Sequence, residues 1–177
     1  MTISLRTARL LLRPWHDGDV AAFTELSADP AVMEYLVPLS GWVARARAHW
    51  EEHGFGQWVV EITGEAGFIG VVGLNTISYE AHFTPAVEVA WRFARAYWGR
   101  GYATEAARAA LDYGFERLAL AEIVATTVPA NQRSRRVMER LGMTRAPEDD
   151  FDVPHLPEGP LKRHVLYRLR SSKTGAS

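Results

Sequence analysis

Two glycines flank an arginine in the stretch WGRGYAT, residues 98–104, directly before a run with helical periodicity. The first main-chain amides of a helix have no acceptors inside the helix and carry partial positive charge. Glycine lacks a Cβ and adopts positive φ, so it lets an anion approach those amides closely. The stretch therefore has the chemistry of a phosphate-binding turn, in which Gly99 and Gly101 give access. The amides of residues 100–104 would donate, and Arg100 would add charge.

The glycine turn does not identify its ligand, because a plain tight connection between a strand and a helix also uses glycine. The dinucleotide fingerprint G-x-G-x-x-G is not met, since Thr104 stands where its third glycine belongs. That fingerprint also needs an acidic residue at the end of the next strand, whereas Glu122 opens its strand. No Gly-Lys-Ser/Thr follows, which excludes the Walker phosphate loop.

A second candidate set of ligands is HWEEH at residues 49–53, which fits the metal-binding pattern H-x-x-E-H. Its two imidazoles would lie one helical turn apart, but a third ligand is not evident. We therefore expect no metal site. The absence of cysteine excludes disulfides, zinc–thiolate sites and a cysteine-bound acyl intermediate.

Composition predicts a globular protein of one domain, residues 1–177, with a core over about 7–170 and a frayed tail over 171–177. Hydrophobic residues make up 47% of the 177 residues and charged residues 23%. The net charge of −1 argues against a sequence-independent nucleic-acid binder. No run has the pattern of a secretion signal or the length of a membrane span, so we expect no membrane partner and a cytoplasmic location.

Hydrophobic periodicity predicts a mixed α/β order of strand, two helices, several mostly antiparallel strands, helix, strand, helix and strand. A run of alanines at three- and four-residue steps follows the glycines and predicts a helix packed closely on a sheet. The predicted strands are 8–15, 57–63, 67–77, 86–94, 122–128 and 162–170, and the predicted helices are 16–29, a turn from Pro30, 40–54, 103–118 and 131–143.

Two motifs at matched spacing, WRFARAYWGRGYATEA (91–106) and PANQRSRRVMERLGM (129–143), resemble the GNAT acetyltransferase superfamily. The opening TARLLLRPWHDGDVAAFTELSADPAVMEYL resembles its RimJ/RimL branch, and the likeness runs from about Thr7 to Arg170. The resemblance implies a GNAT fold: a mostly antiparallel sheet of about seven strands with a splayed parallel pair and helices on both faces.

The resemblance also implies acetyl-CoA as co-substrate, with its pyrophosphate on the glycine turn and its pantetheine arm along residues 91–93. The family turn, Gln/Arg-x-x-Gly-x-Gly/Ala, aligns with residues 98–103 and departs from it at Trp98, which puts a side-chain contact there in doubt. Asn131 would cap its helix, bind the arm, or do both. The candidate cofactor residues are Trp91, Arg92, Phe93, Trp98, Gly99, Arg100, Gly101, Tyr102, Ala103, Thr104, Asn131 and Ser134, and Arg133, Arg135 and Arg136 are candidates for the 3′-phosphate.

Acetyl transfer to an amine needs a base for the amine, a donor for the oxyanion and a proton for the leaving thiolate. We choose Glu88 as the base, since the RimJ/RimL branch often carries an acidic residue there; the alternative is an exposed strand glutamate. Glu105 is a rival carboxylate, better suited to stabilising its helix terminus. Many family members place a tyrosine acid where this chain has Met138, which leaves Ser134 as the acid or as a helix cap. We expect direct attack without a covalent intermediate.

The acceptor is not identified by the sequence. A protein N-terminus, a polyamine, an amino acid and an aminoglycoside all stay open, and the acidic segment EDDFD (148–152) would favour a cationic amine. Tyr35, Trp42, Trp50 and Phe55 could line its groove or belong to the core. A non-catalytic acyl-CoA sensor is the alternative function. A homodimer is compatible with this branch, but no surface for it is evident.

Overall fold

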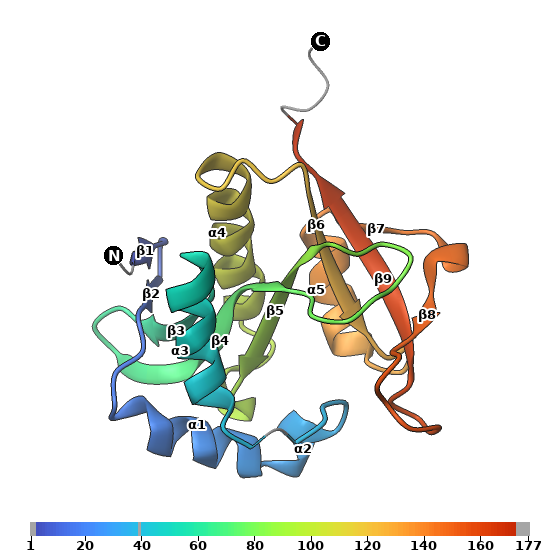
Figure 1. Ribbon diagram of the computed structural model, residues 1–177. Coiled ribbons are helices and arrows are strands. Elements are labelled where there is room, and N and C mark those ends of the chain that lie inside the picture. The colour runs from blue at the N-terminus through green and yellow to red at the C-terminus, as the bar shows by residue number, and fades with distance from the viewer. Residues whose placement is uncertain (1–2, 39, 173–177) are drawn as a thin grey trace.

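The computed structural model describes residues 3–38 and 40–172, which form one twisted, mostly antiparallel sheet with helices on both faces (Figure 1). The strands are β1 (Leu5–Arg6), β2 (Leu10–Arg13), β3 (Gln57–Ile62), β4 (Ala66–Thr76), β5 (Val87–Phe93), β6 (Glu122–Thr127), β7 (Thr144–Arg145), β8 (Phe151–Asp152) and β9 (Arg163–Arg170). The helices are α1 (Asp19–Ala28), α2 (Pro30–Met33), α3 (Trp42–His53), α4 (Tyr102–Glu116) and α5 (Gln132–Arg140), with 3₁₀ turns at Arg95–Tyr97 and Pro147–Asp149.

The predicted α/β fold class is confirmed, and each long predicted strand is present. Among the described residues the sheet has nine strands in the order β1-β2-β3-β4-β5-β6-β9-β7, with β8 paired to β9. Six of them are the strands that the periodicity predicts, and the other three, β1, β7 and β8, have two residues each, which is too short to show a sequence period. The total therefore exceeds the seven or so that the resemblance implies. Within the segment predicted to be frayed, 171–177, the Ser171 amide donates to the Ala121 carbonyl at 2.9 Å. Residues 173–177 lie outside the described residues.

The parallel neighbours β5 and β6 pair at a single position, Glu88 with Val124. Beyond that position the two strands diverge, which Figure 1 shows as a widening gap between them. Each strand keeps a full antiparallel partner on its other side, β4 for β5 and β9 for β6. The two halves of the sheet are therefore held firmly while the edges that face the gap stay open.

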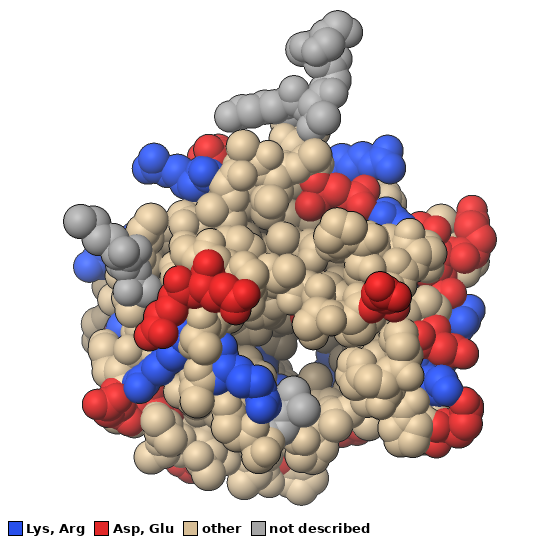
Figure 2. Space-filling view, in the orientation of Figure 1, with Lys and Arg blue, Asp and Glu red and all other residues tan. Residues whose placement is uncertain are grey.

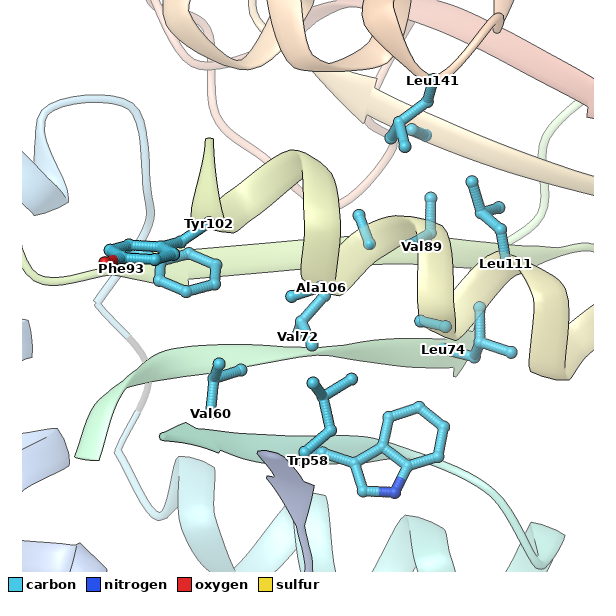
Figure 3. Packing of buried hydrophobic residues seen from close by; sticks show 14 of the residues in the cluster. Trp58, Val60, Val72, Leu74, Val89, Phe93, Tyr102, Ala106, Leu111 and Leu141 are labelled. Atoms are coloured by element: carbon cyan, nitrogen blue, oxygen red, sulfur yellow. The ribbon is translucent and has the colours of Figure 1, made fainter. Parts of the chain in front are cut away.

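Side chains of β5 alternate between the two faces of the sheet, as in any strand. Val89 and Phe93 belong to the main buried cluster, together with the α4 residues Ala106 and Leu111 (Figure 3). Ala106, Ala107 and Ala110 of α4 are fully buried, so the small side chains bring this helix close to the sheet as predicted. The other face of β5 carries Glu88, Ala90 and Arg92, which lie toward α1 and α3.

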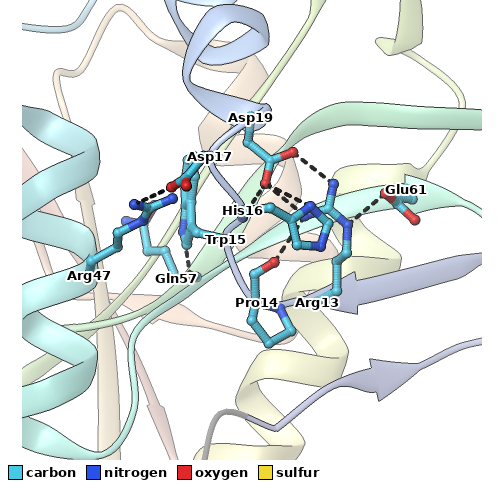
Figure 4. A network of polar contacts seen from close by, with 9 residues as sticks. All are labelled: Arg13, Pro14, Trp15, His16, Asp17, Asp19, Arg47, Gln57 and Glu61. Carbon is cyan, nitrogen blue, oxygen red and sulfur yellow. Dashed lines mark hydrogen bonds and ion pairs between the residues drawn. The ribbon is translucent and has the colours of Figure 1, made fainter.

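A buried ion-pair network joins α1 to β2 and β3 (Figure 4). Arg13 donates to both carboxylate oxygens of Asp19 at 2.8 Å and to Glu61 at 2.6 Å. Burial by itself raises the pKa of Asp19, but the hydrogen bonds from Arg13 and from the His16 amide hold that pKa below its ordinary value. The carboxylate therefore stays charged and fixes the start of α1.

No helix among the described residues is long and apolar enough to cross a bilayer.

Close contact between β4 and β5 depends on Gly70, where an added Cβ would lie 2.4 Å from the Arg92 carbonyl oxygen and 2.8 Å from the Phe93 Cα. We expect Gly70→Ala to lower the free energy of unfolding by about 1–3 kcal/mol, because the backbone of β5 must move. Gly67→Ala on the same strand is the matched control, since no atom lies within 4 Å of its added Cβ. Denaturant unfolding measures both, and equal stabilities would contradict this prediction.

Candidate active site

The glycine turn has the backbone that an anion site requires. Gly99 and Gly101 have φ values of 73° and 81°, as predicted, and Gly101 is the N-cap of α4. Within the described part of the chain, none of the main-chain amides from Gly99 to Thr104 donates a hydrogen bond. No atom lies within 4 Å of the position of a Cβ on Gly99, so a ligand can approach its backbone. Unpaired amides at a helix N-terminus attract phosphate.

Arg9 of the β1–β2 segment holds the turn from behind. It donates to the Arg100 carbonyl at 3.0 Å and pairs with Glu105 at 2.6 Å. Because the peptide bond is trans, that carbonyl contact turns the Gly101 N–H away from Arg9. Glu105 also accepts from the Thr7 hydroxyl at 2.6 Å. Burial raises the pKa of Glu105, but these contacts lower it below its usual range, so Glu105 serves the turn and is not poised as a base.

A first cavity of about 290 Å³ lies between α2, the end of β5, the glycine turn and α5. Every predicted cofactor residue except Arg100 lines it. The Arg100 side chain is exposed and its carbonyl accepts from Arg9, so cofactor binding by its amide and its charge stays a prediction. Sequence reasoning missed Ala31, Val32 and Leu36 in this wall and expected Tyr35 in the acceptor groove, because nothing in a single short apolar segment indicates which cavity it borders.

The N-terminus of α5 forms one side of this cavity. The Asn131 side chain accepts from the Ser134 amide at 3.2 Å and donates to the Thr127 hydroxyl at 2.9 Å. Asn131 therefore caps α5 and ties it to the end of β6. The Ser134 hydroxyl lines the cavity and makes no hydrogen bond to any residue that the structure describes. Met138, which stands at the position of the family tyrosine, is 2% exposed in the core and does not line the cavity.

The arginines of α5 divide into bound and unbound side chains. Arg133 pairs with Glu34 at 2.8 Å and lies over the Trp98 ring at 4.5 Å, while Arg135 donates to the Pro129 carbonyl at 3.0 Å. Arg136 and Arg140 line the cavity, and their side chains have no partner among residues 3–38 and 40–172. Of the three predicted phosphate arginines, only Arg136 is uncommitted. Arg140 was not among the predicted candidates for the 3′-phosphate, because its position in α5 alone does not distinguish it from the other arginines of that helix.

Trp98 fills the position where the family turn has Gln or Arg. Its indole N–H donates to the Phe93 carbonyl at 2.8 Å. The side chain therefore holds the end of β5 against the turn, while its ring contributes to the cavity wall.

A second cavity of about 740 Å³ lies on the opposite face of the sheet, between α3, β4 and β5. Glu88, Ala90 and Arg92 form its β5 side. The two cavities share Leu36, Trp91 and Arg92, so they meet beside the diverging strands. Figure 2 shows an opening in the surface at the place where β5 and β6 separate in Figure 1.

Glu88 lies at the second cavity in a desolvated position. It has no hydrogen bond or ion pair with any described residue, and burial raises the pKa of its carboxyl to about 7. The nearby Tyr79 hydroxyl also has a raised pKa, caused first by its own burial and then by the negative charge of Glu88. A carboxyl with a pKa near neutrality suits general base catalysis.

The acidic segment 148–152 does not line either cavity. Asp149 pairs with Arg168 at 2.9 Å, Asp150 pairs with Arg145, and Asp152 pairs with Arg163 at 3.2 Å. The expectation that this segment favours a cationic acceptor stays a prediction, and these ion pairs do not support it, because arginines of the same chain neutralise the three aspartates. Of the predicted groove aromatics, Trp42 lines the second cavity and Tyr35 the first, while Trp50 and Phe55 pack against the core.

His49 of the HWEEH segment uses both ring nitrogens. Nδ1 donates to the Phe55 carbonyl at 2.8 Å, and Nε2 accepts from the Thr76 amide at 2.9 Å. These two bonds require the neutral ring, in line with the burial that lowers the pKa of His49. The described residues contain no group of three or more side chains that could hold a metal ion.

Several known proteins are similar to this chain. A family model for the acetyltransferase (GNAT) domain matches residues 9–144. The FsC-acetyl coenzyme A-N(2)-transacetylase of Aspergillus fumigatus is 30% identical over 181 residues, covering 94% of this chain and 75% of that protein. An acetyltransferase structure from Agrobacterium tumefaciens is 30% identical, with a TM-score of 0.77 over 96% of this chain and 95% of its own.

The likeness to the RimJ/RimL branch is more distant. RimJ from Mycobacterium smegmatis, solved in complex with CoA-disulfide, is 25% identical, with a TM-score of 0.76 over 99% of this chain and 90% of its own. The match to the GNAT domain spans the split sheet, the glycine turn and α5. The chain therefore belongs to the GNAT family of acetyl-CoA-dependent N-acetyltransferases.

Proposed function

We propose that this enzyme transfers the acetyl group of acetyl-CoA directly to a primary amine, at the point where the two cavities meet. One observation carries the proposal, namely the placement of two complementary groups in adjoining cavities. Main-chain amides of the glycine turn that donate no hydrogen bond within the described chain line the first cavity, and the Glu88 carboxyl, whose pKa is raised, lines the second. The two cavities share Trp91 and Arg92. Each substrate would enter from its own face of the sheet. Such an arrangement supports a ternary complex.

Acetyl-CoA occupies the first cavity in this proposal. Its diphosphate accepts from the amides of residues 99–104, with Arg136 and Arg140 adding positive charge at the mouth. Its pantetheine amides pair with the open edge of β5 as a substitute strand, since the backbone groups there lack a strand partner among the described residues. The thioester then reaches the gap beside Glu88 and Ala90.

The amine approaches through the second cavity. Glu88 takes a proton from it, directly or through water, and the amine nitrogen attacks the thioester carbon. A β5 main-chain N–H at the open edge stabilises the oxyanion. The C–S bond then breaks, and Ser134, whose hydroxyl has no partner in the described chain, gives its proton to the thiolate and regains one from solvent. The chain has no cysteine to form an acetyl-thioester enzyme.

The phosphate assignment is tested with Gly101→Glu. We expect acetyl-CoA affinity to fall about 100-fold or more, because a carboxylate at the N-cap of α4 would repel the diphosphate and would compete for Arg9, which lies 3.4 Å from the added Cβ and holds the turn. Gly101→Ala is the control, since it introduces the same strain at a φ of 81° without the charge. Calorimetric titration with CoA measures both variants, and wild-type affinity in Gly101→Glu would refute the assignment.

The base is tested with Glu88→Gln. We expect kcat to fall about 100-fold or more while CoA affinity is kept. In the wild type, kcat/KM for the amine should rise as pH increases through about 7, where Glu88 loses its proton. That step should be absent from the profile of the variant.

The same variant should change stability in a pH-dependent way. The native carboxyl holds its proton up to about pH 7 and the unfolded one only to about 4.5, so wild-type stability falls between these values as pH rises. We expect Glu88→Gln to be more stable than wild type by about 1–3 kcal/mol at pH 8, with a much smaller gain at pH 4. A pH-independent difference in denaturant unfolding would contradict the raised pKa.

The acid is tested with Ser134→Ala. We expect kcat to fall about 10-fold or more with little change in the KM for acetyl-CoA, because the thiolate would leave unprotonated. Melting temperature should not change, since Asn131 and not the Ser134 hydroxyl caps α5. Ser134→Thr, which keeps a hydroxyl, should recover much of the rate. An unchanged rate in the alanine variant would remove Ser134 from the mechanism.

A further inference from the structure

Arg92 is a partly buried cation that has no carboxylate partner among the described residues. One Nη donates to the Ser27 hydroxyl at 3.2 Å, and the guanidinium lies over the rings of Phe23 and Trp42 at 5.2 and 5.5 Å. Burial lowers the pKa of Arg92 to about 10, which still leaves it charged at neutral pH. Aromatic faces hold this charge in place but do not neutralise it.

Three other partly buried arginines are paired with carboxylates, whereas Arg135 donates to the Pro129 carbonyl and the Tyr167 hydroxyl. Arg13 has Asp19 and Glu61, Arg145 has Asp150, and Arg168 has both Glu122 and Asp149. These side chains have structural roles in which the chain supplies the counter-charge. Arg92 differs, and a buried charge without a counter-charge is costly. Its position is therefore better explained by a ligand than by packing.

The remaining donors of Arg92 are not fully buried. In the described chain, Gln57 Oε1 is the only fully buried side-chain nitrogen or oxygen without a hydrogen bond. The Arg92 donors that lack a partner are therefore reachable from solvent, and Arg92 lines the second cavity. A guanidinium with free donors matches a carboxylate, which it binds through two parallel hydrogen bonds.

Glu88 and Arg92 lie on the same face of β5, four residues apart. Strand geometry separates their Cα atoms by about 13 Å, and both side chains line one cavity beside Ala90. They form no ion pair with each other. The cavity thus offers a proton acceptor at one end and a cation at the other. An amine that also carries a carboxylate would complement both ends.

We propose that Arg92 binds the carboxylate of the acceptor, so that the acceptor class is an amino acid or a similar small amino-carboxylate. This inference rests on the proposed acetyl transfer and deepens it. The carboxylate replaces the missing counter-charge of Arg92 and directs the amine toward Glu88 and the thioester. A polyamine is the competing acceptor class, because Glu52 also lines this cavity and could pair with a second ammonium group. Preferential use of a polyamine by the wild type would overturn the inference.

Matched substrate pairs test the proposal: each of the common amino acids against its carboxamide, with acetyl-CoA saturating and thiol release as the readout. We expect wild type to prefer the free acids that it accepts by about 10- to 100-fold in kcat/KM, because the amide leaves the Arg92 charge unmatched. In Arg92→Met, which keeps the side-chain length, this ratio should fall to near one. Arg92→Lys should give an intermediate ratio.

Arg47→Met is the matched control, since Arg47 is on α3, pairs with Asp17 and does not line the cavity. It should keep the wild-type ratio. Equal use of acid and amide by wild type, or a ratio unchanged in Arg92→Met, would overturn the inference. So would an Arg92→Met defect confined to the KM for acetyl-CoA, which would assign the side chain to the cofactor.

A binding measurement separates this inference from the proposed function. Thermal shift of the CoA-bound protein is recorded with N-acetyl amino acids and with their amides. If no amine supports thiol release but the acids alone stabilise wild type and not Arg92→Met, acetyl transfer fails and carboxylate binding by Arg92 stands. If neither series stabilises the wild type, carboxylate binding by Arg92 is refuted.

Discussion

The single paired position between β5 and β6, Glu88 with Val124, is the feature on which the site depends. A sheet that continued beyond it would use the backbone edges of both strands and close the passage between the two faces. The strands can diverge because β4 and β9 hold each of them from the other side. The open edge leaves polar backbone groups that a peptide-like ligand can satisfy.

One strand serves both cavities because its side chains alternate. Val89 and Phe93 join α4 in the core, and Trp91 packs against that cluster while it borders the first cavity. Glu88, Ala90 and Arg92 face the second cavity, on the side of α1 and α3. A change of register by one residue would exchange these two sets. The close β4–β5 contact at Gly70 keeps that register next to the site.

Charged groups in this fold fall into two kinds. Arg13, Glu105 and the acidic segment 148–152 are paired within the chain, and they position α1, the glycine turn and the β8–β9 region. Glu88 and Arg92 are desolvated and unpaired among the described residues. Unpaired buried charges lower stability, so their presence in one cavity is consistent with selection for ligand chemistry at the expense of stability.

The sequence by itself determined the α/β order and the glycine turn ahead of α4, and it indicated Asn131 as a candidate cap of α5. Each of these depends on nearby residues: hydrophobic period, a missing Cβ, or a side chain three residues from an amide. Only the tertiary structure decided which charges are neutralised. Folding forms the ion pairs Arg145–Asp150 and Arg13–Glu61. No local sequence pattern distinguishes these residues from Glu88 and Arg92, which form no ion pair with a described residue. It also decided that α2 and Arg140 border the first cavity. Burial and ion pairing depend on contacts between segments far apart in the chain. Such contacts leave no periodic pattern in a single sequence from which they could be predicted.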